Sequence, residues 1–170
     1  MQTENIRENQ KGFSLVELII VMAIMVVLVA VLAPQFTKYV QRARDSVIQD
    51  AANQALSMVR TEYALSTLKF TDDCQTITED GKTMKCASII VQAKESDNHL
   101  TMILNGLEYC GKTGAEADNA FMQACGVDEG SKTKSTTAYK ITIKGDDSIS
   151  TAAAFAINVE MSETEKDTGI

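Results

Sequence analysis

The chain has 170 residues, a formal net charge of −7, four cysteines and one proline. Strong nucleic-acid binders neutralise phosphate with clustered Lys and Arg, so this acidic balance argues against strong nucleic-acid binding. The length allows a single globular domain in addition to an anchor segment.

A polar leader, residues 1–12, precedes an apolar run from Phe13 to Ala33. The run has 21 residues, of which only Ser14 and Glu17 are not apolar. As a helix it would span about 30 Å, the thickness of a bilayer's hydrocarbon core. A soluble domain of this size has no room to bury a helix that is apolar on every face. The sequence therefore predicts a transmembrane helix over this run.

Two residues make this helix unusual. A carboxylate such as that of Glu17 costs at least ~2.5 kcal/mol inside a membrane helix, so it is expected to have a partner. The alternative is an interfacial glutamate that reaches the lipid headgroups. Pro34 closes the apolar run, removes a backbone donor and crowds the carbonyl of Ala30, so a continuing helix should kink there.

These residues resemble the N-terminus of type IV pilins and the related pseudopilins. The resemblance is carried by Lys11-Gly12, Phe13-Ser14-Leu15-Val16-Glu17-Leu18, the apolar run and Pro34. It implies that a prepilin peptidase cleaves between Gly12 and Phe13 and methylates the new amine of Phe13. It also implies that Glu17 pairs with the Phe13 amine of a neighbouring subunit in a helical filament.

The resemblance implies a structural subunit of a bacterial type IV pilus. Such a subunit is a single-pass membrane protein before assembly and then part of a surface filament for adhesion, twitching motility, aggregation or DNA uptake. The implied partners are other copies of the chain, minor pilins, the prepilin peptidase, the assembly ATPase, the inner-membrane platform protein and membrane lipid. No cofactor is expected. The alternatives are a pseudopilin of a type II secretion or competence system, or a plain membrane-tethered binding domain.

The charges that flank the apolar run favour the opposite membrane orientation, with the C-terminal domain inside the cell. Lys38, Arg42 and Arg44 follow it, and by the positive-inside rule alone the C-terminal domain would be cytoplasmic. The cysteines and the resemblance together predict that the head is periplasmic or extracellular.

Residues 34–70 are predicted to continue the helix in amphipathic form. No Gly or Pro occurs between Gln35 and Thr71, so one long helix is expected from about Ser14 to Leu68. Its stripe of apolar residues at three- and four-residue steps should lie on a β-sheet. The stripe comprises Phe36, Val40, Ala43, Val47, Ala51, Ala55, Met58, Val59 and Tyr63.

The head, residues 71–170, is expected to be α+β, with a small antiparallel sheet packed on the long helix and loops stapled by disulfides. Residues 74–86 read as a hairpin with a three-residue loop, Glu79-Asp80-Gly81, which pairs Thr78 with Lys82 and brings Cys74 opposite Cys86. For residues 87–93, strand and helix are not separable.

The rest of the head is predicted in the same way. Helical spacing of apolar residues indicates helices over 97–109 and 115–125. Residues 130–137 form a polar loop. Strands are expected at 138–144 and 149–161, followed by an acidic, frayed tail from Ser162.

All four cysteines follow the apolar run, and an even number in a small exported domain predicts two disulfides. The favoured pairs are Cys74–Cys86 and Cys110–Cys125, with the connectivity open. A zinc site is less favoured, because no two cysteines have the close spacing of structural zinc sites.

No catalytic motif is evident. The chain has no P-loop, no G-x-S-x-G and no G-x-G-x-x-G sequence. His99 is the only histidine and lacks partners at metal or triad spacing. The chain is therefore not expected to be an enzyme or to bind a metal.

Overall fold

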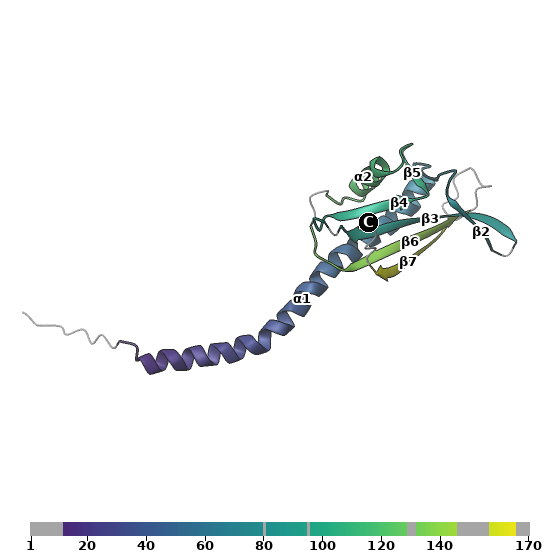
Figure 1. Ribbon diagram of the computed structural model, residues 1–170. Helices are drawn as coiled ribbons and strands as arrows, with labels where there is room; N and C mark the ends of the chain where they lie inside the picture. The colour runs from purple at the N-terminus through teal and green to yellow at the C-terminus, as the bar shows by residue number, and fades with distance from the viewer. Residues whose placement is uncertain (1–11, 80, 95, 129–131, 146–156, 166–170) are drawn as a thin grey trace, which may run out of the picture. The chain divides into compact units, whose positions relative to one another are not determined.

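The computed structural model describes residues 12–79, 81–94, 96–128, 132–145 and 157–165. The chain divides into two compact units, residues 1–40 and 41–170, and the second unit contains all the β-strands described below (Figure 1).

Helix α1 spans Leu15–Ala64, 50 residues with Pro34 inside it. It ends where Ser66 adopts a φ of 59°, a left-handed conformation that closes a helix. Residues Leu68–Phe70 form strand β1 rather than the last turn of the helix, so the predicted helical segment 34–70 is too long at its C-terminal end.

The head contains a five-stranded antiparallel sheet and a separate two-stranded sheet. The large sheet is built from β2 (Gln75–Glu79), β3 (Lys82–Ala93), β4 (Leu100–Asn105), β6 (Thr137–Gly145) and β7 (Ile157–Glu165). The small sheet pairs β1 with β5 (Leu107–Tyr109), and helix α2 spans Ala115–Ala124. The predicted α+β architecture and the helix at 115–125 are confirmed.

Strand β3 organises the large sheet. Strand β6 pairs with β3 from Lys85 to Gln92, while β2 and then β4 pair with successive parts of β3. Residues 87–93, left open between strand and helix in the sequence, are therefore part of a central strand. A strand paired on both sides and half-buried favours the β-branched Ile and Val found here.

The register predicted for the first hairpin is wrong by one residue. Glu79 pairs with Lys82, and Gln75 rather than Cys74 pairs with Cys86. The loop therefore has two residues, with Gly81 at a φ of 75°. Such two-residue loops match the right-handed twist of the flanking strands, which explains why the hairpin uses one instead of the predicted three-residue loop.

The predicted helix over 97–109 is also wrong, because this segment forms β4 and β5. Leu100, Met102 and Leu104 are buried in alternation, the two-residue period of a strand. Ile103 lies on the other face, opposite Ile90 of β3. The same apolar residues satisfy both periods over so short a stretch, and pairing with β3 decides the outcome.

The last predicted pair of strands is confirmed, but the residue range of its second strand is corrected. Strand β6 matches the predicted strand at 138–144, but β7 continues past Met161 to Glu165. Glu163 pairs with Tyr139, so the start of the predicted frayed tail is strand. Residues 146–156 lie outside the described residues. They include most of the predicted turn at 145–148 and the start of the predicted strand at 149.

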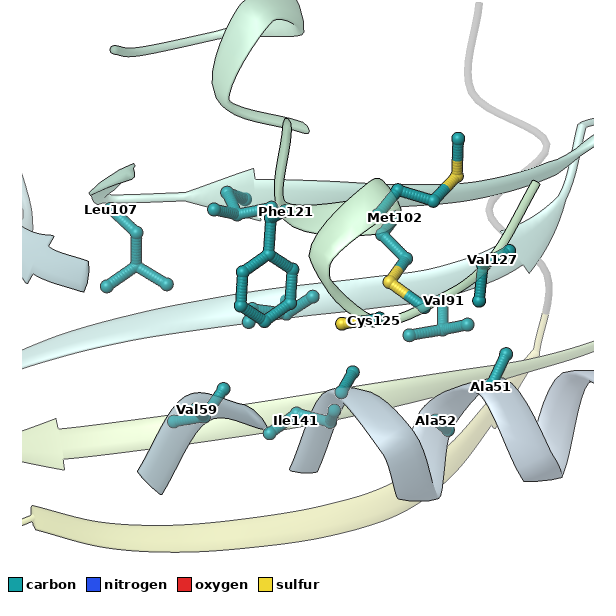
Figure 2. Packing of buried hydrophobic residues seen from close by; sticks show 14 of the residues in the cluster. Ala51, Ala52, Val59, Val91, Met102, Leu107, Phe121, Cys125, Val127 and Ile141 are labelled. Carbon is teal, nitrogen blue, oxygen red and sulfur yellow. The ribbon is translucent and has the colours of Figure 1, made fainter. Parts of the chain in front are cut away.

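The core of the head lies between the second half of α1, the large sheet and α2. Figure 2 shows Ala51, Ala52 and Val59 of α1 beside Ile141 of β6, with Phe121 of α2 and Met102 of β4 in the same cluster. The buried residues of α1 are Ile48, Ala51, Ala52, Ala55 and Val59. Three of these belong to the predicted stripe, whereas Val47, also predicted, is 44% exposed.

One glycine of the core should be indispensable. Gly106 has a φ of 74°, and a Cβ built on it would lie 3.0 Å from Cβ of Cys74. Gly106→Ala should therefore combine backbone strain with overpacking and lower the free energy of unfolding by roughly 2–4 kcal/mol.

Gly81→Ala is the matched control, because Gly81 has a φ of 75° with open space around it. Its cost should be backbone strain alone, about 1 kcal/mol. Urea unfolding of the full chain in detergent measures both. Equal losses for the two variants would contradict the close packing at Gly106.

Candidate functional site

The residues of the predicted cleavage site lie outside any helix. Gly12 and Phe13 precede α1, and the Phe13 side chain is 86% exposed. A peptidase can bind a scissile bond only where the backbone is exposed and outside a helix. The structure thus leaves the Gly12–Phe13 peptide bond accessible just ahead of the helix.

Glu17 forms a contact that the sequence analysis missed. Its Oε2 accepts a hydrogen bond from the backbone N–H of Ser14 at 2.9 Å. The N–H of Leu18 donates to the carbonyl of Ser14 at 3.2 Å, which makes Ser14 the residue at the helix N-cap. Ser14-x-x-Glu17 is a capping-box spacing, the signal that would have predicted this bond. The carboxylate is held at the positive end of the helix dipole.

The first half of α1 is apolar on all sides. Every large apolar side chain from Leu15 to Leu32 is between 44% and 73% exposed. Within the described residues, α1 is the one helix long and apolar enough to cross a membrane, a criterion of length and composition only. Packing within the chain leaves this surface uncovered.

Pro34 lies inside α1, and the helix continues through it. The hydroxyl of Thr37 donates to the carbonyl of Pro34 at 3.0 Å, a local bond on the C-terminal side of the proline. The predicted kink at Pro34 stays a prediction.

Residues 7–33 match the family model of the prokaryotic N-terminal methylation motif. The chain is type IV pilin-like. No curated protein and no solved structure matches it. The motif is a class III signal peptide, and with the apolar helix it indicates a membrane-anchored prepilin exported to the periplasm or cell surface. It places this pilin-like chain among structural, non-enzymatic proteins.

The described part of the chain contains no group of three or more metal-ligating side chains. His99 lies at the end of a loop, where its backbone N–H donates to Oδ1 of Asp97 at 3.1 Å and its backbone pairs with Lys132. The hydrogen bond from His99 holds the pKa of the exposed Asp97 carboxyl below its ordinary value.

No disulfide joins the four cysteines, all of which lie in described segments. Cys74 is buried, Cys86 is half-buried, and both line one hollow of about 400 Å³ in the head. The one-residue shift in register leaves Cys86 opposite Gln75, and Cys74 precedes β2, so the predicted pair is not a directly opposed pair of the hairpin.

Cys110 and Cys125 flank an aromatic contact. Cys110 follows Tyr109 directly, and the rings of Tyr109 and Phe121 meet edge to face with centroids 5.4 Å apart. Cys125 lies one turn after Phe121 and donates its N–H to the Phe121 carbonyl at 2.9 Å. The two cysteines were predicted to join two helices, but Cys110 follows strand β5 and only Cys125 follows a helix.

The two thiols of this pair differ in exposure. Cys110 is exposed, whereas Cys125 is 8% exposed. Burial, followed by the nearby Glu62 carboxylate, raises the pKa of Cys125 to about 12. The same two causes raise the pKa of Tyr109 to about 12.

This difference predicts the order of alkylation in the reduced protein. The thiolate is the reactive form, and with a pKa of about 12 Cys125 holds roughly a thousandth of the thiolate of an ordinary cysteine at pH 8. Iodoacetamide should therefore label Cys125 at least about a hundredfold more slowly than Cys110, measured by peptide mass spectrometry. In denaturant the two rates should converge. Equal rates in the folded protein would show that Cys125 is not buried.

Proposed function

We propose that this chain is the structural subunit of a bacterial type IV pilus. In this proposal the precursor is cleaved between Gly12 and Phe13, and the mature chain waits in the membrane on its apolar helix. It then polymerises through that helix, with the heads forming the outer wall of the filament. A pseudopilin of a secretion or competence system would carry the same motif, and the four cysteines with a head of this size favour a pilus.

The observation that carries the proposal is a carboxylate in an otherwise apolar, uncovered helix. Glu17 lies in the first turn of α1, within residues 7–33 that the methylation motif matches. A plain membrane anchor gains nothing from a charge in this turn, because a membrane penalises the charge and the helix cap does no more than offset that penalty.

The partner that we propose is the methylated amine of Phe13 in a neighbouring copy. Cleavage creates this amine next to Ser14, and the N–H of Ser14 survives cleavage, so the helix cap remains. One carboxylate oxygen of Glu17 can then hold the cap while the other receives the neighbour's amine. Two opposite charges in a low-dielectric filament core attract strongly only when they meet, which fixes the register between subunits.

The remaining partners follow from the same proposal. They are the prepilin peptidase, an assembly ATPase, an inner-membrane platform protein and minor pilins. Adhesion, twitching motility, aggregation and DNA uptake are the tasks open to such a filament.

We also propose that Cys74–Cys86 and Cys110–Cys125 form disulfides once the head is exported. Each bond forms as two thiols lose two hydrogens to an oxidant of the exported compartment. The proposal is supported by the surroundings of the cysteines: Cys74 and Cys86 line a common hollow, and Cys110 and Cys125 follow Tyr109 and Phe121, whose rings are in contact.

Intact-mass spectrometry of protein sheared from the cell surface tests the proposal. The expected chain starts at Phe13, is heavier by one methyl group and gains the mass of four hydrogen atoms on reduction of its two disulfides. Peptide mapping then assigns the two pairs. A chain that keeps residues 1–12 and stays in the membrane fraction would instead identify a plain tethered domain. A processed chain whose mass does not rise by four hydrogen atoms on reduction would refute only the disulfides.

Replacing the carboxylate should block assembly. Glu17→Ala should reduce the filament yield at least about tenfold, because the Phe13 amine of each copy is left buried without a partner. Glu17→Gln keeps the shape and removes the charge, so it should fail as well. Sheared filaments are quantified against total cellular subunit.

Glu116→Gln is the control, since Glu116 is an exposed carboxylate in the first turn of α2 and far along the chain from the anchor. It should assemble as the wild type does. Normal filament yield for Glu17→Ala would remove the charge pair from the proposal.

A further inference from the structure

The head contains a buried polar contact between the loop before β6 and α1. In the described residues, Thr133 and Ser135 are the two polar side chains that are buried, at 6% and 3% exposure. Both reach α1 near the start of its part in the head: the hydroxyl of Ser135 donates to Oδ1 of Asp45 at 2.5 Å. The hydroxyl of Thr133 donates to the carbonyl of Arg44 at 3.2 Å.

Each end of this contact makes a further hydrogen bond. The side-chain amide of Gln41 donates to the same Oδ1 of Asp45 at 3.2 Å, one helical turn earlier. The N–H of Thr137, the first residue of β6, donates to the hydroxyl oxygen of Ser135 at 3.0 Å. Ser135 thus connects the start of a central strand to a carboxylate on the helix through two hydrogen bonds.

The position of the contact along α1 matters. Ile48 is the first fully buried residue of the helix, and the preceding turn, from Gln41 to Asp45, is partly or fully exposed. An exposed helical turn held only by its own backbone bonds opens at low free energy. Hydrogen bonds from buried donors to a carboxylate are among the stronger polar contacts in proteins.

We propose that residues 132–137 form a latch on α1. Through Ser135 and Thr133 the latch holds the turn from Gln41 to Asp45 and stops opening of the exposed helix before it reaches the core at Ile48. Asp45 and Ser135 are then positioning residues of the head, a role that hydrophobic packing of α1 does not provide at this end of the core.

Hydrogen exchange of the full chain in detergent, followed by mass spectrometry, tests the latch. Ser135→Ala and Asp45→Ala should each speed exchange of residues 41–47 about tenfold or more, while residues 51–60 in the core change little. Asp45→Asn keeps an acceptor for Ser135, so exchange should return to near the wild-type rate.

Ser46→Ala is the matched control. Ser46 is exposed, and its hydroxyl donates to the carbonyl of Ala43 at 2.8 Å, within α1 itself. It should leave exchange unchanged. The latch is refuted if Ser135→Ala behaves like Ser46→Ala, or if Asp45→Asn exchanges as fast as Asp45→Ala.

A thermal melt followed by circular dichroism separates the latch from general loss of structure. The latch predicts a small change in melting temperature beside the local change in exchange. If hydrogen exchange rises equally in residues 51–60 and in β3, Ser135 stabilises the whole head and not residues 41–47 alone, and the proposal is wrong. The measurement uses the monomer, so its result does not depend on whether the chain forms filaments.

Discussion

The exposed apolar surface of the first half of α1 is the constraint on which the rest of the molecule depends. From Leu15 to Leu32 the large side chains remain at least 44% exposed, and burial of apolar surface is worth about 25 cal/mol per Å². Such a helix is stable only in lipid or among other apolar helices. Those two environments are close in energy, because lipid tails and packed Val, Leu and Ile side chains offer similar van der Waals contacts. A helix of this kind can move from lipid to a bundle of apolar helices without passing through water, provided that a specific contact fixes its depth and register.

The second half of the same helix meets a different requirement. In the head, α1 buries one narrow face, and the residues there are mostly small: Ala51, Ala52 and Ala55 beside Ile48 and Val59. The sheet contributes larger residues to the same core: Ile89, Val91, Ile141 and Ile143 of β3 and β6 are each 0% exposed. Figure 2 shows Val91 and Ile141 in this cluster with Ala51 and Ala52. The outer face remains polar, with Asp50, Asn53 and Gln54 exposed. The N-terminal half of this continuous helix is therefore suited to a membrane, and its C-terminal half is suited to packing on a sheet.

The sequence predicted the parts of this fold that one strong local signal determines. The apolar run, the methylation motif, helix α2 and the alternating strand β6 all have such a signal. It failed where a short apolar segment fits two periods: residues 100–109 satisfy helical spacing, yet pairing with β3 makes them strands. The register of the first hairpin depended on whether its loop has two or three residues, which Gly81 alone does not determine.

At the site, Glu17 was identified by its cost in a membrane, but its bond to Ser14 was missed although the capping-box spacing was present. The contact of Ser135 with Asp45 joins residues 90 positions apart, so no local pattern could have indicated it.

The cap explains how a carboxylate can remain in this helix without a partner from another chain. Glu17 would cost at least ~2.5 kcal/mol in the membrane without a partner. Its hydrogen bond to the N–H of Ser14 engages a charged acceptor, a class of bond worth about 1.5–3 kcal/mol, and the helix dipole adds a favourable term at the N-terminus. These contributions are of the same size as the penalty, so the lone chain can hold the charge near the membrane surface. They do not exceed the penalty by much, which leaves the carboxylate responsive to a second, positively charged donor. A residue balanced in this way suits the subunit that we propose, which is first held alone in a membrane and then binds other copies of itself.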